Sequence, residues 1–263
     1  MKHIGIAAPD TWVSVLNWVG IPPVVLYFVC MFYPLYSFMV GDGDWVYVQD
    51  VWYRWQSLNV GVLAFTSSVI ALNISIYNTN KQRERNFVAA RAFLPEAFSE
   101  LTTYFKLCAP ILKEAWQIAS KKSTEIPLQA QVPDLLASYK EIFRQCINFA
   151  EPDVGERLAY ILCRLQVHNS LIKELSASFG KDSTIKENAQ NIITYLYSLA
   201  ELQALVNKTF DYARGLEEFD SSNLVWEDYR NAYANLDIST TDFDDLVGFT
   251  QRAIKRYNSH KNI

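Results

Sequence analysis

Cysteine and histidine are the first residues to consider for catalysis, because a thiol paired with an imidazole base is a common nucleophile. The chain has four cysteines and three histidines, of which only Cys163 and His168 fall close together on one expected helix. Five positions of helix rotate these two side chains about 140° apart. The imidazole therefore cannot activate the thiol. The sequence predicts no cysteine nucleophile, and we expect no enzymatic activity.

Metal and nucleotide sites have characteristic spacings, and none of these occurs here. Asp42 and Asp44 resemble the start of a calcium loop, but Tyr53 stands where an EF-hand requires glutamate. Glycine-rich phosphate loops, serine-hydrolase elbows and kinase motifs are absent from the sequence. The cysteines lack the paired spacing of a zinc site: Cys30, Cys108, Cys146 and Cys163. We expect no cofactor and no metal, and interpret the cysteines as reduced, mostly buried thiols, which fits a cytosolic location of the region that carries most of them.

Three polar residues recur at seven-residue intervals in an otherwise apolar segment: Asn59, Thr66 and Asn73. Amides in hydrocarbon are costly without a hydrogen bond, so this polar stripe needs a partner. It is a candidate pore or oligomer stripe, which could line a water-accessible path when several subunits assemble. The alternative is that Asn59 and Asn73 reach the two interfaces while Thr66 bonds its own backbone.

Two charge-free stretches place the polar stripe in a membrane. No Asp, Glu, Lys or Arg occurs between Asp10 and Asp42, or between Arg54 and Lys81. Within them, residues 21–40 and 57–77 each supply the roughly 20 apolar residues that a membrane-crossing helix needs. Tryptophans, which favour the headgroup level, flank both segments: Trp12, Trp18, Trp45, Trp52 and Trp55. The alternative, a soluble domain with an aromatic core, fits two uncharged stretches of this length poorly.

A second stripe on the second span consists of small residues spaced three and four apart: Gly61, Ala64, Ser68, Ala71 and Ser75. Small residues let helix backbones approach closely, which drives association in lipid. This small-residue stripe is nearly opposite the polar stripe. Because the first span can cover only one of the two faces, we expect the other face to meet a second subunit and the protein to be a homo-oligomer.

Charge at the ends of the spans sets the expected orientation. The connector 41–56 carries three aspartates and one arginine, whereas the segment after the second span is basic. Cytoplasmic flanks hold the excess of Lys and Arg, so we expect both termini in the cytoplasm. The positive-inside anchor comprises Lys81, Arg83, Arg85 and Arg91. The first three could also hold anionic lipid headgroups, and Arg91 could instead pair with Glu84 or face the soluble region.

The order of these segments predicts an all-α fold, a two-helix transmembrane hairpin followed by a cytosolic helical bundle. We expect a membrane domain over residues 1–80, a helical stalk over 81–120 and a bundle over 121–263. The second span has no cap and should continue to Ala92, after which Pro95 bends or restarts the helix. Residues 121–133 are the longest expected loop, and Asp134 is expected to begin the next helix.

Two long amphipathic helices are expected in the middle of the bundle. The first ends before Gly180 and has a three-four stripe of apolar residues and one histidine: Leu158, Ile161, Leu165, His168, Ile172, Leu175 and Phe179. The second begins at a Ser183 cap and ends at Gly215. The two should pack antiparallel, with His168 and Gln203 bonding locally or to other helices. Shorter helices follow over about 224–236 and from a cap at Thr240 or Thr241.

Net charge limits the classes of partner. From Lys81 onward, 22 basic residues face 24 acidic ones, so we expect no direct binding of nucleic acid. Between Gly215 and Thr250 there are nine acidic residues and only Arg230. This acidic region is either a docking surface for a basic partner or a solvated face with helix caps, and the second interpretation is favoured.

The layout of two N-terminal spans, a short external connector and a helical cytosolic domain resembles the two-transmembrane effectors of bacterial anti-phage systems. That resemblance implies a bacterial inner-membrane protein whose soluble part is restrained by a regulatory protein partner, and whose membrane part perturbs the bilayer when the soluble part is released or clustered. No nucleotide-binding element is recognisable, so the resemblance leaves the trigger unspecified. The competing interpretation is a membrane-anchored helical scaffold that recruits a cytosolic partner.

Overall fold

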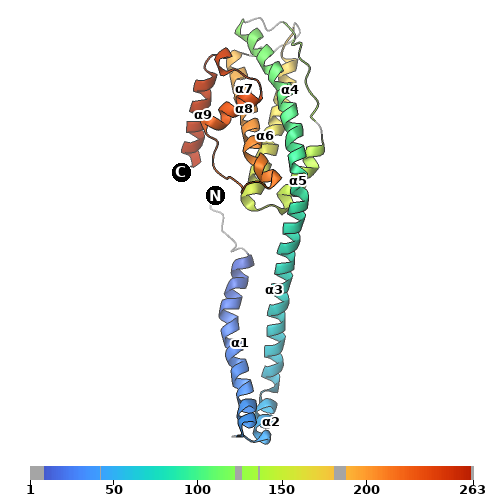
Figure 1. Cartoon of the computed structure of the whole chain (residues 1–263), viewed down its shortest axis with the longest axis vertical. Helices are drawn as coiled ribbons and strands as arrows, with labels where there is room; N and C mark the ends of the chain where they lie inside the picture. Colours follow the sequence, from blue (N-terminus) through green and yellow to red (C-terminus); the bar gives the residue numbers. More distant parts are fainter. Residues whose placement is uncertain (1–8, 42, 122–125, 136, 181–187, 262–263) are drawn as a thin grey trace. The chain divides into compact units, whose positions relative to one another are not determined.

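The computed structural model describes residues 9–41, 43–121, 126–135, 137–180 and 188–261. The described chain is helical, with no strand among these residues. It divides into two compact units between Gln82 and Arg83 (Figure 1). The all-α class is therefore confirmed, and each unit is described by itself below.

The first unit holds α1 (Pro9–Val40), α2 (Trp45–Arg54) and most of α3 (Gln56–Arg91). After α1 the chain turns at Gly41, whose φ of 89° favours glycine. Asp44 then caps α2, because its side chain accepts a hydrogen bond from the Val46 amide at 3.2 Å. The connector is thus a turn followed by a short helix that carries Trp45 and Trp52.

Helices α1 and α3 lie side by side within this unit (Figure 1). A Cβ added at Gly20 of α1 would lie 3.7 Å from the Phe65 ring of α3, which places the two helices in close contact there. Most of their apolar side chains are nevertheless exposed. Two helices, Trp18–Val40 and Gln56–Ser120, are long and apolar enough by length and composition to cross a membrane.

The expectation of a simple two-helix hairpin needs a correction. The second apolar helix continues far beyond the apolar stretch, and with α4 (Leu94–Ser120) it makes one bent helical run of 65 residues from Gln56 to Ser120. Only Ala92 and Phe93 separate α3 from α4, and Pro95 lies in the first turn of α4. The expected continuation and restart at Pro95 are confirmed, because proline fits the first turn, where its missing N–H costs nothing.

The second unit is a bundle built around α4, α6 (Pro152–Ala177) and α7 (Ala189–Arg214). Helix α5 (Ser138–Phe149) packs on α4 and α6, whereas α8 (Trp226–Asn235) and α9 (Leu246–Lys261) pack on α7 (Figure 1). The region expected as a stalk therefore contributes directly to the bundle, since α4 buries Leu94, Phe98 and Phe105 in its core.

The expected apolar stripe from Leu158 to Phe179 is buried along its whole length, but α6 ends at Ala177, earlier than the expected stop at Gly180. Helix α7 ends at Gly215 as expected, and this glycine adopts a left-handed φ of 74°. Helix α7 begins at Ala189 and is capped by Asn188, whose side chain accepts from the Gln190 amide at 2.6 Å. The expected Ser183 cap lies outside the described residues.

Two expected helix starts are wrong. Asp134 lies outside any helix and α5 begins at Ser138, because Leu135 packs against the core from the preceding irregular segment. At Thr240 there is only a short 3₁₀ turn, Thr240–Asp242, and α9 begins at Leu246. Asp245 adopts a φ of 63°, which interrupts the helical path between them.

Candidate functional site

The polar stripe lies on the sheltered side of α3. Asn59, Thr66 and Asn73 are half-buried, whereas most of their neighbours on α3 are exposed. Tyr27 of α1 donates a hydrogen bond to the Asn59 amide oxygen, so this side faces α1. The Thr66 hydroxyl donates to the Val62 carbonyl at 2.7 Å, and Asn73 Nδ2 donates to the Val69 carbonyl at 2.8 Å. These polar groups are therefore bonded within a single chain.

The small-residue stripe lies on the opposite, uncovered side of α3. Its five members Gly61, Ala64, Ser68, Ala71 and Ser75 are all exposed. A Cβ added at Gly61 would meet nothing within 4 Å, and the Ser68 hydroxyl is bonded to the Ala64 carbonyl at 2.8 Å. The first span was expected to cover only one of these two faces of α3. Helix α1 covers the polar stripe and leaves the small-residue stripe uncovered.

The four residues of the expected anchor differ in their surroundings. Lys81, Arg83 and Arg85 are exposed on the C-terminal part of α3. The Arg91 guanidinium instead lies 5.3 Å from the centre of the Tyr212 ring and 5.9 Å from that of Phe87. Arg91 therefore makes cation–π contacts within the second unit, which matches the alternative that it faces the bundle.

A cavity of about 480 Å³ opens in the bundle between α6, α7, α9 and the connector 216–225. Its wall includes Glu201, which is only 7 % exposed and accepts from Tyr160 Oη and Arg164 Nε, both at 2.9 Å. Tyr197 and Tyr229 stack on one another with ring centres 5.3 Å apart and hydroxyls 3.0 Å apart. Burial raises the pKa of all three tyrosines, so their hydroxyls stay protonated.

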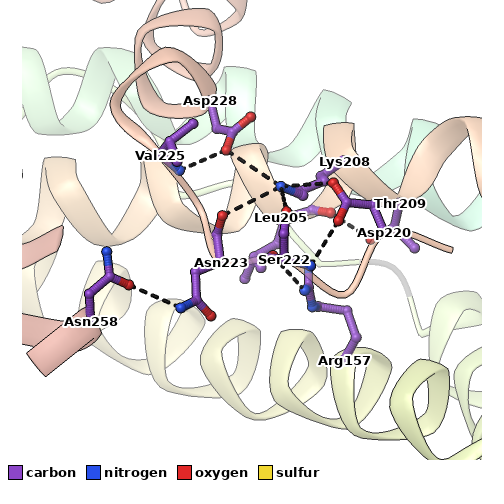
Figure 2. Close-up of polar contacts among 10 residues, drawn as sticks. All are labelled: Arg157, Leu205, Lys208, Thr209, Asp220, Ser222, Asn223, Val225, Asp228 and Asn258. Atoms are coloured by element: carbon purple, nitrogen blue, oxygen red, sulfur yellow. Dashed lines mark hydrogen bonds and ion pairs between the residues drawn. The ribbon is translucent and has the colours of Figure 1, made fainter. Parts of the chain in front are cut away.

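The connector 216–225 is held in place by a nearly buried lysine on α7 (Figure 2). Lys208 Nζ lies 3.1 Å from an Asp220 carboxylate oxygen and 3.8 Å from one of Asp228, and it donates to Ser222 Oγ at 2.7 Å. Hydrogen bonds from Ser222 and Lys208 lower the pKa of Asp220 to about 2. Asn223 Nδ2 adds a bond of 3.0 Å to Asn258 of α9. These contacts neutralise part of the acidic region.

Arg157 of α6 lies beneath the connector (Figure 2). One terminal nitrogen, Nη2, donates to the Ser222 carbonyl at 3.1 Å, and the guanidinium lies 5.6 Å from the centre of the Phe219 ring. The other, Nη1, is buried and has no hydrogen-bond partner. Burial lowers the pKa of Arg157, and the Asp220 carboxylate offsets part of that effect. An unsatisfied guanidinium donor at a cavity wall is costly unless something else bonds it.

His168 and Cys146 are buried in the bundle, whereas Cys163 is exposed. His168 is 2 % exposed between the Tyr104 and Phe105 rings, its Nε2 has no partner, and burial lowers its pKa to about 4. Burial raises the pKa of Cys146 to about 11, which leaves the thiol unreactive. Gln203 bonds as expected, to Asn207 at 2.7 Å and to Thr102 of α4 at 3.5 Å.

Within the described ranges, no group of three or more His, Cys, Asp or Glu side chains is arranged to hold a metal ion. No protein-family model, curated protein or solved structure matches this chain. The cavity and its arginine were missed in the sequence. One signal was present: Asp153, Glu156, Arg157 and Tyr160 recur at helical spacing on one face of α6.

Proposed function

We propose that this protein is a two-pass effector of the bacterial inner membrane, with both termini in the cytoplasm. The single observation that carries the proposal is the contrast between two long apolar helices that expose their side chains and a bundle with its own buried core. Contiguous apolar surface of this extent is unfavourable in water. Lipid is the solvent that removes the cost, and the basic residues after the second span favour a cytoplasmic bundle.

The contacts of α3 support a resting state in which the membrane part is closed. Asn59, Thr66 and Asn73 each make a hydrogen bond to α1 or to their own helix, which lowers the cost of holding them away from water. The exposed small-residue stripe supplies the surface on which two copies of α3 approach closely. When the bundle is released or clustered, rotation of α3 away from α1 turns the polar stripe toward the axis of the oligomer. The stripe then lines a path for water and ions.

The biological setting that we propose is anti-phage defence. The support is the layout: two spans, a short external connector and a helical cytoplasmic bundle, as in the two-transmembrane effectors of bacterial anti-phage systems. In this setting a regulatory protein restrains the bundle until infection. Damage to the envelope by the released membrane part then stops the growth of the infected cell.

A dye that reports membrane potential tests the effector. Expression of the full chain in a bacterium is expected to depolarise the cells, and the combined change Asn59→Leu, Thr66→Leu and Asn73→Leu is expected to abolish depolarisation at equal membrane levels. The matched control replaces Ser67 and Asn78 by Leu, because both are exposed on α3 away from the polar stripe. Depolarisation that persists in the triple variant would contradict a role for the stripe.

A second candidate function is a membrane-anchored scaffold that recruits a basic cytosolic partner. The observation in its favour is that the polar stripe is already satisfied inside the chain, as a plain anchor requires. In addition, Glu217, Glu218 and Glu227 of the acidic region are exposed. Unimpaired growth and normal membrane potential at high membrane levels of the protein would favour this scaffold over the effector.

A further inference from the structure

We infer that the cavity between α6, α7, α9 and the connector 216–225 binds an uncharged, flat heteroaromatic ring that carries a carbonyl acceptor, of nucleobase or nucleoside size. The inference concerns a ligand site in the bundle and does not depend on what the membrane helices do. Its volume, about 480 Å³, lies in the usual range for small-molecule sites. Its aromatic wall, its unsatisfied donor and its charge each limit what can bind.

Aromatic side chains make up much of the cavity wall. Tyr160, Tyr197, Tyr229, Tyr257 and Phe219 all line it. Flat rings gain contact area and stacking energy against such a wall. Tyr197 and Tyr229 already stack on each other and bond through their hydroxyls, and Tyr229 is only 3 % exposed. A planar ligand is therefore expected to lie against Tyr160 and Tyr257, which line the cavity and are exposed.

The unsatisfied donor is Arg157 Nη1. It is the buried guanidinium nitrogen without a partner, whereas Nη2 is already bonded to the Ser222 carbonyl. Arg157 lines the cavity, and binding requires its side chain to turn so that Nη1 faces the ligand. A ring carbonyl is a fitting acceptor for this single donor, because its oxygen accepts a hydrogen bond from one guanidinium N–H.

The charge around the cavity argues against a polyanionic ligand. Asp153 and Glu156 lie on the same face of α6 as Arg157 and line the cavity, and both are exposed. Glu201 also lines it and is neutralised by Arg164. A ligand with several phosphates would meet two carboxylates for one available guanidinium. The N–H groups of a ring amide, in contrast, can donate to those carboxylates.

Guanosine, adenosine and guanosine triphosphate are suitable probes for the full chain in detergent, with binding measured by calorimetry. Guanosine is expected to bind about ten-fold more tightly than adenosine, which lacks the ring carbonyl. Arg157→Gln is expected to remove that difference, whereas Arg144→Gln, an exposed arginine on α5, should keep it. A melting curve for each variant separates loss of binding from loss of fold.

A second variant tests the cavity without touching the arginine. Ser221 lines the cavity and is exposed, so Ser221→Trp should fill the space and weaken guanosine binding at least ten-fold. Ser239→Trp, exposed elsewhere, should leave guanosine binding unchanged. The inference is overturned if guanosine does not bind at millimolar concentration, if adenosine binds equally well, or if guanosine triphosphate binds more tightly than guanosine.

Discussion

Helices α1 and α6 place their apolar residues in different surroundings. On α1 the large apolar side chains face outward, with Trp18 83 % and Met39 78 % exposed. On α6 the apolar side chains form one narrow stripe, and Leu158, Ile161 and Leu165 are fully buried. A helix that is apolar all round needs an apolar environment, whereas an amphipathic helix makes its own by packing. The second unit folds around its own core, and under the proposed function the first unit depends on lipid.

The largest expected effect comes from a charge placed in the core of the second unit. Leu165→Asp is expected to unfold the bundle, because an unpaired carboxylate at a position with no exposure costs on the order of 4 kcal/mol or more. Val167→Asp, two residues along and 47 % exposed, is the matched control and should fold normally. Far-UV circular dichroism and a melting curve of the full chain in detergent provide the measurement.

Membrane insertion should survive the same change. If the first unit depends on lipid and not on the bundle, the Leu165→Asp protein still sediments with membranes and resists extraction at high pH. A normal melting profile for Leu165→Asp would mean that the α6 stripe is not the core of the bundle.

The next largest effect is a dependence of the bundle's stability on pH. His168 has a folded pKa of about 4 against an ordinary value of 6.5, so the folded state disfavours the protonated form. Between these values the unfolded chain binds a proton that the folded chain does not. Stability is therefore fully present above about pH 6.5 and is lost as the pH falls toward 4, by up to about 3 kcal/mol.

Replacement of His168 shows how much of this pH dependence the histidine causes. His168→Leu keeps an apolar side chain of similar size between the Tyr104 and Phe105 rings, and it should flatten the change in melting temperature between pH 7 and pH 5. The same pH dependence in the wild type and in His168→Leu would rule out this histidine as its source.

A smaller effect is expected in the first unit, because helix association in lipid, the proposed setting, depends on side-chain size. Ser68→Ile places a branched side chain on the small-residue stripe, so close approach of two α3 helices should be lost at a cost of about 1 kcal/mol. Ser67→Ile makes the same change on the flank of the stripe and serves as the control. Cross-linking in detergent, or energy transfer between labelled copies in vesicles, measures the association. Equal association of the two variants would eliminate the stripe as a contact surface.

Local rules account for what the sequence predicted correctly. The charge-free stretches, the α6 stripe and the helix stop at Gly215 each follow from composition, periodicity or backbone freedom over a few residues. Helix α7 shows what these local rules cannot predict. Its other faces are buried too, including Glu201, Leu202 and Leu205, because α4, α6, α8 and α9 all pack on it. A single stripe in the sequence cannot reveal how many neighbours a helix has.

For the candidate sites as well, local spacings were predictable from the sequence and tertiary contacts were not. Both stripes of α3 were visible as spacings, but the face covered by α1 was decided by the Tyr27–Asn59 bond between residues far apart in the chain. The cavity was not predicted, because its wall combines α6, α7, α9 and the connector 216–225. Arg157 resembles any surface arginine in the sequence, and only the tertiary structure leaves its Nη1 without a partner.

Labelling of single cysteines from one side of the membrane tests the central claim most directly. Cysteine is placed at Gln49 in α2 or at Ser259 in α9, both exposed, after the exposed Cys30 and Cys163 are replaced by alanine. In intact spheroplasts a membrane-impermeant maleimide is expected to label Gln49→Cys, and to label Ser259→Cys only after the membrane is permeabilised. Equal labelling of both positions in intact spheroplasts, or of neither, would contradict two membrane crossings with a cytoplasmic bundle.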